Sequence, residues 1–216
     1  MQYPFATPAI PLLDRIADAL VDKGYLILRD ALDPQLTQAL FQRVRKLSAA
    51  HFQRAGVGRE QDLHLNSRVR QDQIRWLEPG DAAETAYLEW MKALRTGLNR
   101  RLFMGLFDYE SHFSHYAPGA FYKRHLDAFR GQTNRVLTTV FYLNPHWQQR
   151  DGGELLLYPE QGDEVLARVA PDAGTLVIFL SDRFPHEVLP ARSDRYSIAG
   201  WFRVNTSINN QIDPPR

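Results

Sequence analysis

The chain contains no cysteine among its 216 residues, and this absence removes several kinds of chemistry. Disulfide bonds, iron–sulfur clusters and thiol nucleophiles all require a cysteine sulfur, so none of them can operate here. Any bound metal must therefore be held by histidine, aspartate, glutamate or other oxygen ligands. A chain without cysteine also fits a reducing compartment, and we expect a cytoplasmic protein.

Long hydrophobic runs and a strong excess of charge are also lacking. No apolar stretch approaches the roughly 20 residues that a membrane-spanning helix needs, and Met1–Pro11 lacks the basic start and apolar run of a secretory signal. The formal net charge is +1, which provides no bulk attraction to nucleic acid. We therefore expect neither a membrane nor a nucleic-acid partner. The length of the chain is enough for one domain with a sizeable core.

The two halves of the chain have different hydrophobic patterns. Three segments carry apolar residues three and four positions apart, as amphipathic helices do, namely 12–21, 33–50 and 82–103. Between them, two short apolar runs predict strands at Tyr25–Leu28 and Gln73–Leu77, and the polar stretch Gly56–Arg70 predicts a mobile loop. After Gly105, short β-rich segments alternate with turn residues and predict eight strands, at 111–117, 122–126, 136–143, 154–158, 165–169, 175–179, 187–189 and 196–204. So many short strands at close spacing predict a sandwich or barrel, not a βαβ sheet.

A candidate metal site lies in the string from Tyr122 to Asp127. Side chains two residues apart on a strand point to the same face, so His125 and Asp127 can aim at one point. Two histidines and one carboxylate on one face of an octahedron favour Fe(II) and leave three positions open. The pair alone is a weak signal, because a His-x-Asp string occurs by chance in many proteins.

The third metal ligand must come from elsewhere in the chain. The candidates are His51, His64, His112, His115, His146 and His186. His186 stands out because it follows an apolar strand and a turn, and Greek-key connections bring late strands beside early ones. His112 and His115 precede the His125 strand, and we expect both at the surface or half-buried.

Arg195 lies nine residues after His186, at the start of the last predicted strand. Its guanidinium group matches a carboxylate bidentately, which a lysine cannot copy. If Arg195 points into the same barrel below the metal, it would bind the distal carboxylate of 2-oxoglutarate while the keto-acid end chelates iron. The alternative is a surface arginine paired with Asp194 or Glu187.

These residues belong to a longer pattern. Segment 111–203 resembles the prolyl 4-hydroxylase group of the Fe(II)/2-oxoglutarate-dependent dioxygenases, in particular the hypoxia-inducible-factor type and its bacterial relatives. The matching strings are His115–Gly119, Tyr122–Asp127, Arg135–Asn144, Trp147, Asp151–Leu155, Ser181–Val188 and Arg195–Ile198, with Arg70–Leu77 upstream. Ala199 stands where some relatives have threonine, which leaves the choice of substrate open.

The resemblance implies a role for each matching residue. The iron ligands would be His125, Asp127 and His186. The residues that bind or line the 2-oxoglutarate pocket would be Arg195, Tyr142, Tyr116, Val140, Leu155 and Ala199. The residues near the substrate would be Trp201, Arg70 and Asp72, the last two in a loop that closes over a peptide. Alternatively, Tyr142 and Trp201 are packed core aromatics, and Arg70 and Asp72 form only an exposed salt bridge.

The resemblance also implies the fold and its limits. We expect an α+β protein with a double-stranded β-helix, that is, a jelly-roll or cupin-like barrel, supported by N-terminal helices. Residues 1–204 would form a single domain, with helical support at 1–105 and the dioxygenase core at 106–204. The tail 205–216 is expected to be loosely ordered.

The implied reaction hydroxylates a C–H bond while 2-oxoglutarate is converted to succinate and carbon dioxide. It requires Fe(II), 2-oxoglutarate and O2, and we add ascorbate as an expected accessory cofactor. The expected substrate is C4 of an exposed prolyl residue in a protein, with the translation machinery as one candidate. Two alternatives stay open: a 2-oxoglutarate oxygenase that acts on a small molecule or another side chain, and a non-catalytic module that binds 2-oxoglutarate or a peptide.

Overall fold

The computed structural model describes residues 7–55, 68–128, 134–205, 207–208 and 211–212. In this part of the chain the helices are α1 (Ile10–Asp22), α2 (Pro34–Lys46) and α3 (Ala82–Leu102), with short 3-10 turns η1 (Ala49–His51) and η3 (Gln149–Asp151). Asp33 begins α2 by accepting a hydrogen bond from the Gln35 N–H, and Asp81 begins α3 in the same way. The second helix ends at Lys46, a few residues before the end near residue 50 that its apolar pattern predicts. Most of the loop expected at 56–70 lies outside the described residues.

The strands form two main antiparallel sheets. The seven-stranded sheet has the order β1-β9-β6-β11-β4-β3-β2, and the four-stranded sheet has the order β5-β10-β7-β8. The strands of the large sheet are β1 (Tyr25–Leu28), β2 (Gln53–Arg54), β3 (Gln73–Trp76), β4 (Leu106–Tyr116), β6 (Arg135–Tyr142), β9 (Leu176–Leu180) and β11 (Arg195–Val204). Those of the small sheet are β5 (Tyr122–His125), β7 (Leu155–Leu157), β8 (Ala167–Val169) and β10 (His186–Val188).

This arrangement is the expected double-stranded β-helix, but it differs from the prediction in three details. The strand ladders of the described residues do not close into a continuous barrel; an isolated bridge between Arg70 and Tyr122 is where the two sheets approach each other. Strand β4 begins at Leu106, five residues before the predicted start. Part of the expected loose tail pairs as β12 (Ser207–Ile208) with β13 (Gln211–Ile212).

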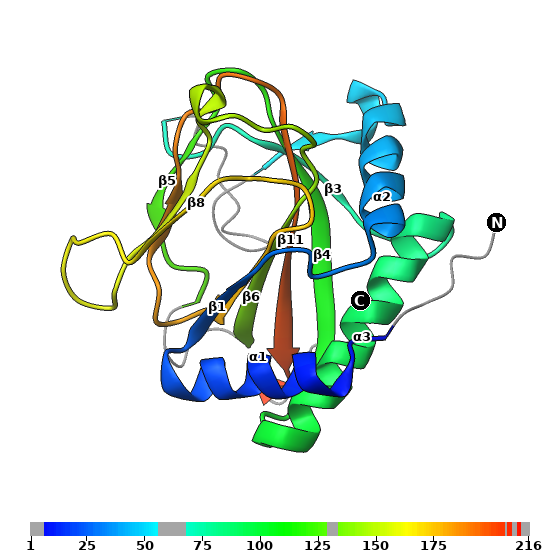
Figure 1. Cartoon of the computed structure of the whole chain (residues 1–216), viewed down its shortest axis with the longest axis vertical. Coiled ribbons are helices and arrows are strands. Elements are labelled where there is room, and N and C mark those ends of the chain that lie inside the picture. Colours follow the sequence, from blue (N-terminus) through cyan, green and yellow to red (C-terminus); the bar gives the residue numbers. More distant parts are fainter. Residues whose placement is uncertain (1–6, 56–67, 129–133, 206, 209–210, 213–216) are drawn as a thin grey trace.

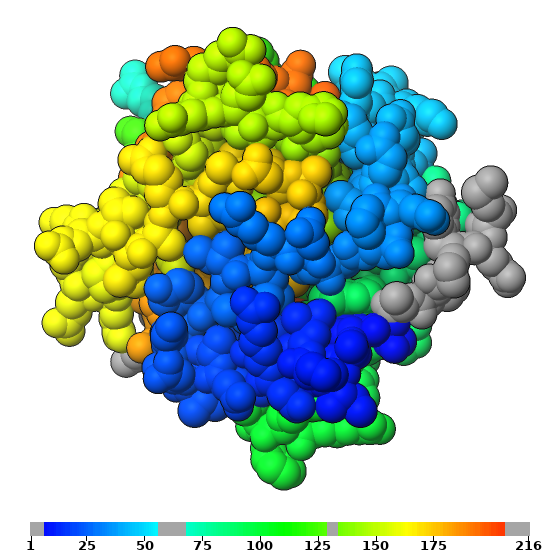
Figure 2. Space-filling view, in the orientation of Figure 1, coloured from blue at the N-terminus to red at the C-terminus, as the bar shows by residue number. Residues whose placement is uncertain are grey.

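The helices cover one face of the large sheet, which we call the outer face. Figure 1 shows α2 and α3 beside the long strands β4 and β11, with β5 and β8 on the opposite side of the view. Large apolar side chains of three neighbouring strands, Phe113, Phe141 and Phe202, are fully buried in the same core as the helix residues Leu13 and Tyr87. Figure 2 shows the N-terminal segments, in blue, at the surface of the lower and right-hand part of this view, beside later segments in yellow and yellow-green. Burial of apolar surface is therefore what attaches the helices to the sheet.

The opposite, inner face of the large sheet packs on the small sheet. Alternate residues of a strand point to opposite faces, so β11 presents Arg195, Ser197, Ala199, Trp201 and Arg203 to this side. A second core of residues from both sheets lies between them, including Tyr116, Val140, Tyr142, Leu155 and Val188. The polar groups of the candidate site thus line a space between two sheets that apolar side chains hold together.

No helix in the described part of the chain combines the length and the apolar character that crossing a membrane requires.

Candidate active site

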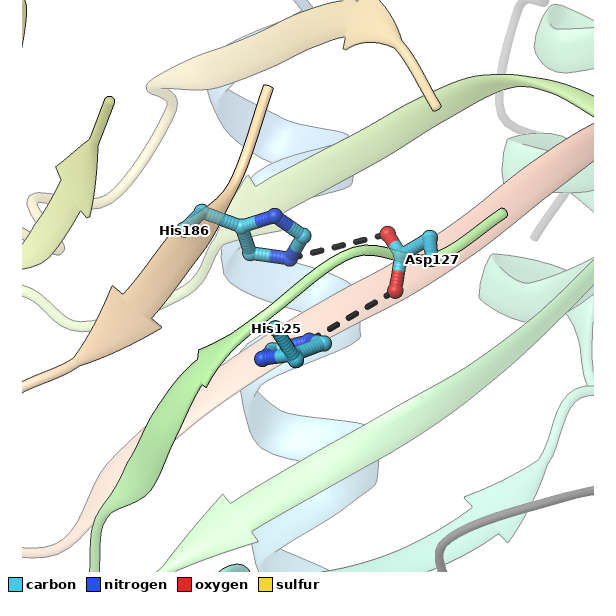
Figure 3. Close-up of side chains that lie close together, drawn as sticks. All are labelled: His125, Asp127 and His186. Atoms are coloured by element: carbon cyan, nitrogen blue, oxygen red, sulfur yellow. Dashed lines mark ion pairs between the residues drawn. The ribbon is translucent and has the colours of Figure 1, made fainter. Parts of the chain in front are cut away.

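His125, Asp127 and His186 come together at the inner face, as the sequence predicts. Strand β10 pairs with β5 so that His186 lies directly opposite His125, and their ring centres are 4.2 Å apart. The Nε2 atoms of both histidines lie 3.6 Å from an oxygen of Asp127, one from each carboxylate oxygen (Figure 3). One ligand atom from each residue lies within 4.8 Å of the others. Residues far apart in the chain therefore present three donor atoms to one point.

Backbone carbonyl groups orient both imidazole rings. The Nδ1 atom of His125 lies 2.8 Å from the carbonyl oxygen of Lys123, and the Nδ1 atom of His186 lies 3.1 Å from that of Phe184. A carbonyl oxygen only accepts, so each Nδ1 carries the proton and each Nε2 keeps a free lone pair. Burial, with the neighbouring His125 imidazole, lowers the pKa of His186 to about 4. His186 is therefore neutral near pH 7, as a metal ligand must be.

Asp127 lies in a bend just after β5. The strand ends at His125, one residue before the predicted end at residue 126. The Thr138 hydroxyl donates a hydrogen bond of 2.8 Å to Asp127 Oδ2 and lies 2.9 Å from the Ser181 hydroxyl. Although burial alone would raise the pKa of the Asp127 carboxyl, the two imidazoles and Arg135 hold it well below its usual range. The carboxylate is thus charged and fixed by a neighbour on β6.

This donor set fits a divalent metal ion with open positions. With metal–ligand bonds of about 2.1 Å, neighbouring ligand atoms of an octahedron lie about 3 Å apart. The two observed separations of 3.6 Å are to different oxygens of Asp127, and one ligand atom from each residue lies within 4.8 Å of the others, so the three side chains would move closer together around a bound ion. Two imidazoles and one carboxylate on one face are the donors that favour Fe(II) with room for other ligands.

Arg195 is fully buried beyond the triad. A backbone carbonyl group in the turn at Gly153 fixes its side chain. Its Nε donates to the carbonyl oxygen of Gly153 at 2.8 Å, and Gly153 has a φ of 69°, which favours glycine. The guanidinium group also lies over the rings of Tyr116 and Tyr142, at 4.8 and 5.1 Å from their centres. The alternative of a surface arginine is wrong, because Asp194 pairs with His115 and Glu187 accepts from Tyr158.

Two buried polar atoms beside each other have no hydrogen-bond partner in the described structure: Arg195 Nη2 and the hydroxyl oxygen of Tyr142. A buried cation without a counterion is costly, and an unsatisfied buried hydroxyl adds to that cost. Burial raises the pKa of Tyr142 to about 12, with the Arg195 charge opposing the shift, so the hydroxyl stays a donor. Two unused donors around a positive charge fit a carboxylate, which is the group at the distal end of 2-oxoglutarate.

The expected pocket walls lie between Arg195 and the triad. Val140 pairs with Ala199 across β6 and β11, one alternate position from Thr138 on one side and from Tyr142 on the other. Leu155 faces them from the small sheet and is buried in the same core. These three apolar residues line the space between the metal ligands and Arg195.

The expected substrate residues lie in two places: Trp201 is at the end of the inner face away from Arg195, whereas Arg70 and Asp72 come just before β3 and lie near Tyr116 and Tyr122. Trp201 is buried, with the guanidinium of Arg135 3.6 Å from a ring centre. Arg70 and Asp72 form a two-point ion pair with one N–O distance of 2.9 Å, and Asp72 is buried, so the alternative of an exposed salt bridge is wrong. The Arg70 guanidinium lies over Tyr122, whose ring stacks on His125 at 3.6 Å.

The other histidines that the structure describes do not reach the triad. His51 and His146 are exposed, His115 is half-buried beside Asp194, and His64 lies outside the described residues. His112 is buried between Trp76 and Trp201, so its predicted place at the surface or half-buried is wrong. Burial and the charge of Arg70 lower its pKa to about 3. His112 lies opposite Ala199 and therefore on the inner face. This position could not be predicted from the sequence, because it depends on the register between β4 and β11.

Comparison with known proteins agrees with this geometry. A family model described as the 2OG-Fe(II) oxygenase superfamily matches residues 111–203. Human prolyl hydroxylase EGLN3 is 30% identical over 199 residues, which cover 88% of this chain and 82% of that protein. This chain belongs to the prolyl hydroxylase family of 2OG-Fe(II) oxygenases. Family membership implies Fe(II), 2-oxoglutarate and O2 as the reactive groups.

Solved prolyl hydroxylases share the fold. A Pseudomonas putida prolyl-4-hydroxylase is 42% identical with a TM-score of 0.81, and the match covers 90% of this chain and all of that one. A Trichoplax adhaerens prolyl hydroxylase, solved with a peptide of the hypoxia inducible factor oxygen degradation domain, is 29% identical with a TM-score of 0.81 and 90% coverage of both chains. Human Egl nine homolog 1 is 30% identical over 206 residues, which are 90% of this chain but only 47% of that protein. The chain thus spans about half the length of that protein.

Proposed function

We propose that this protein is an Fe(II)- and 2-oxoglutarate-dependent dioxygenase that hydroxylates C4 of a prolyl residue in a protein. The observation that carries the proposal is the buried positive charge of Arg195 beside the unpartnered Tyr142 hydroxyl, on the same inner face as the His-Asp-His triad. A dianionic keto acid that reaches from one to the other would satisfy both.

The residues divide the work along the inner face. Bound iron would supply the redox chemistry by which one O2 is divided between succinate, formed from 2-oxoglutarate with loss of carbon dioxide, and the hydroxyl group of the product. His125, Asp127 and His186 would hold it, with Thr138 fixing the carboxylate. At the other end, Arg195 would neutralise the distal carboxylate of the cosubstrate.

The pocket around the cosubstrate would orient it and keep water away. Tyr142 would donate its hydroxyl to the same carboxylate as Arg195, and Tyr116 would pack beside it. Val140, Leu155 and Ala199 would exclude water from the chain between the two carboxyl groups.

A peptide substrate is supported by the Trichoplax relative, which was solved in complex with a peptide fragment of the hypoxia inducible factor oxygen degradation domain. We propose that Trp201, Arg70 and Asp72 contact such a peptide, because Trp201 lies beyond the triad on the side away from Arg195 and Arg70 lies over Tyr122, whose ring stacks on the ligand His125. The intact triad and Arg195 argue against a non-catalytic module. The translation machinery as target, the need for ascorbate, the cytoplasmic location and the single domain at 1–204 stay predictions.

The test is a comparison of proteins from cells that contain the wild-type enzyme or the His186→Ala variant. Mass spectrometry should find prolyl residues that gain one oxygen atom only with the wild type, and amino-acid analysis should identify 4-hydroxyproline. The purified enzyme should form succinate in equal amount with the hydroxylated peptide. Succinate formation with a small molecule and with no prolyl peptide would replace this proposal with the small-molecule alternative.

A further inference from the structure

A chain of four charged side chains lies at the end of the inner face beyond Trp201. Asp108 accepts from Arg203 at 2.9 Å, and Arg203 Nη1 lies 3.6 Å from Glu110. Glu110 in turn accepts two hydrogen bonds from Arg135, at 2.7 and 2.9 Å. Asp108, Glu110 and Arg203 are buried. We call these four residues the charged chain.

The charged chain ends on the indole ring of Trp201. The Arg135 guanidinium lies over that ring, 3.6 Å from a ring centre, and the ring of His112 meets it edge-on at 5.4 Å. Trp201 pairs with Glu110 on β4 and with Thr138 on β6 in the strand register. The indole is therefore fixed next to the residue that holds the ligand Asp127.

Trp201 also carries the one unpartnered buried polar atom of the described inner face that the cosubstrate does not explain. Its Nε1 has no hydrogen-bond partner in the described structure, like Arg195 Nη2 and the Tyr142 hydroxyl. A phenylalanine would fill the same wall without leaving a donor unsatisfied. An indole N–H is only a donor, so its missing partner must be a hydrogen-bond acceptor, such as a carbonyl oxygen.

Stability alone does not account for the charged chain. Burying charged groups is costly, and apolar residues of similar size commonly replace buried ion pairs without loss of stability. A planar guanidinium over an aromatic ring does, however, restrict the ring to one orientation. The arrangement thus fixes the direction of an N–H group that has nothing to bind in the free protein.

We propose that Glu110 is a positioning residue, which acts through Arg135 to hold Trp201 so that its indole N–H donates to a backbone carbonyl oxygen of the peptide substrate. This inference rests on the proposed function, since it takes the substrate to be a peptide. A peptide fits because its carbonyl groups offer acceptors on both sides of the reacting residue. Asp108 and Arg203 support Glu110 from the other side.

The test compares Glu110→Gln with a matched control, Glu84→Gln. Glu84 is also fully buried and also binds two arginines, Arg43 at 2.7 Å and Arg75, but it lies in the helical layer outside the inner face. Both substitutions remove one buried charge and keep the side-chain shape. Each is made with and without Trp201→Phe, and Arg135→Lys is a further variant that keeps the charge but loses the planar contact.

Peptide kinetics give the first measurement. Trp201→Phe should raise the peptide KM about 3- to 10-fold, the effect of losing one hydrogen bond, with a smaller fall in kcat and an unchanged requirement for 2-oxoglutarate. Glu110→Gln and Arg135→Lys should raise the peptide KM in the same direction, and Glu110→Gln should add nothing in the Trp201→Phe background. Glu84→Gln should leave the peptide KM unchanged. Additive effects of Glu110→Gln and Trp201→Phe, or an unchanged KM in either, would overturn the proposal.

Fluorescence of Trp201 gives a second measurement that needs no substrate. The emission and anisotropy of this residue are obtained by subtracting each protein's Trp201→Phe partner. Glu110→Gln should change both and Glu84→Gln should change neither, and an unchanged Trp201 signal in Glu110→Gln would overturn the positioning role. If the wild type hydroxylates no prolyl peptide, the proposed function fails, while this measurement still decides whether Glu110 positions Trp201.

Discussion

The two faces of the seven-stranded sheet are built from the same strands but have opposite chemistry. On the outer face, Phe113, Phe141 and Phe202 meet the helices in an apolar core. On the inner face the alternate residues include charged and polar side chains beside apolar ones, and several of their polar atoms are unpartnered in the described structure. Because side chains alternate along a strand, each strand supplies stability on one side and chemistry on the other.

Buried charge is also used differently on the two faces. In the helical layer, Glu84 is satisfied by Arg43 and Arg75. On the inner face, Arg195 has hydrogen bonds to Gly153 and Ser197 but no carboxylate partner in the described structure. The comparison teaches that an unpaired buried charge in an otherwise well-satisfied protein indicates a missing ligand.

The sharpest test of this division removes a metal ligand from the inner face. His186→Ala should reduce succinate formation to background, a larger loss than the roughly 10- to 100-fold expected from losing a residue that only orients a ligand. Thermal unfolding should remain cooperative, because the outer core is untouched. Turnover at the normal rate in this variant would show that His186 is not a ligand.

A substitution on the outer face should have the reverse result. Phe141→Ala removes a fully buried ring that packs near Tyr87 and should lower the free energy of unfolding by about 3–5 kcal/mol. The kcat of the remaining folded enzyme, and its requirement for 2-oxoglutarate, should stay as in the wild type. Urea unfolding and steady-state kinetics check the two parts, and a specific loss of activity without loss of stability would contradict the division.

The unpaired charge of Arg195 should determine cosubstrate affinity. Arg195→Ala should raise the 2-oxoglutarate concentration needed for half-maximal rate roughly 30- to 150-fold, because a charge-assisted hydrogen-bond pair contributes about 2–3 kcal/mol. Tyr142→Phe should produce a smaller rise of up to about tenfold, from the loss of one hydrogen bond. Titration of the apo protein with 2-oxoglutarate provides the measurement, and an unchanged affinity in Arg195→Ala would move the anchor elsewhere.

Thr138 is expected to help metal binding indirectly, because it hydrogen-bonds the metal ligand Asp127 and is not a ligand itself. Thr138→Val keeps the side-chain shape but removes the hydrogen bond to Asp127, and should weaken metal affinity roughly tenfold. Thr139→Val is the matched control on the outer face of the same strand. Calorimetric titration with Mn(II) would compare the two, and equal affinities would show that Thr138 does not help to hold Asp127.

The smallest effect at neutral pH concerns His112. Its folded pKa of about 3 lies below the unfolded value of 6.5, so the unfolded state binds the extra proton and stability falls as the pH drops from 6.5 toward 3. His112→Gln should remove a slope of up to about 1.4 kcal/mol per pH unit from that range. Urea unfolding of both proteins at pH 7 and pH 4.5 measures it. Parallel stability curves would show that His112 is not buried in its neutral form.

The amino-acid pattern predicted the elements well where the physical signal is local. Helical spacing predicted segments at 12–21 and 82–103, and α1 (Ile10–Asp22) and α3 (Ala82–Leu102) lie within two residues of these bounds. Family motifs named the triad and Arg195 before any geometry was known. Local signals failed at the early start of β4 and at the bend that carries Asp127, because partner strands decide where a strand begins and ends.

The sequence by itself determined the donor set: histidine and carboxylate without cysteine, one arginine for a carboxylate, and strands with alternating faces. Only the tertiary structure decided which side chains meet, since contacts such as Thr138 with Asp127, or Arg135 with Trp201, depend on the register between strands distant in the chain. Register depends on how whole faces pack, and a shift of one residue would exchange the two faces of a strand. That is why His112 was misplaced and the charged chain was not foreseen.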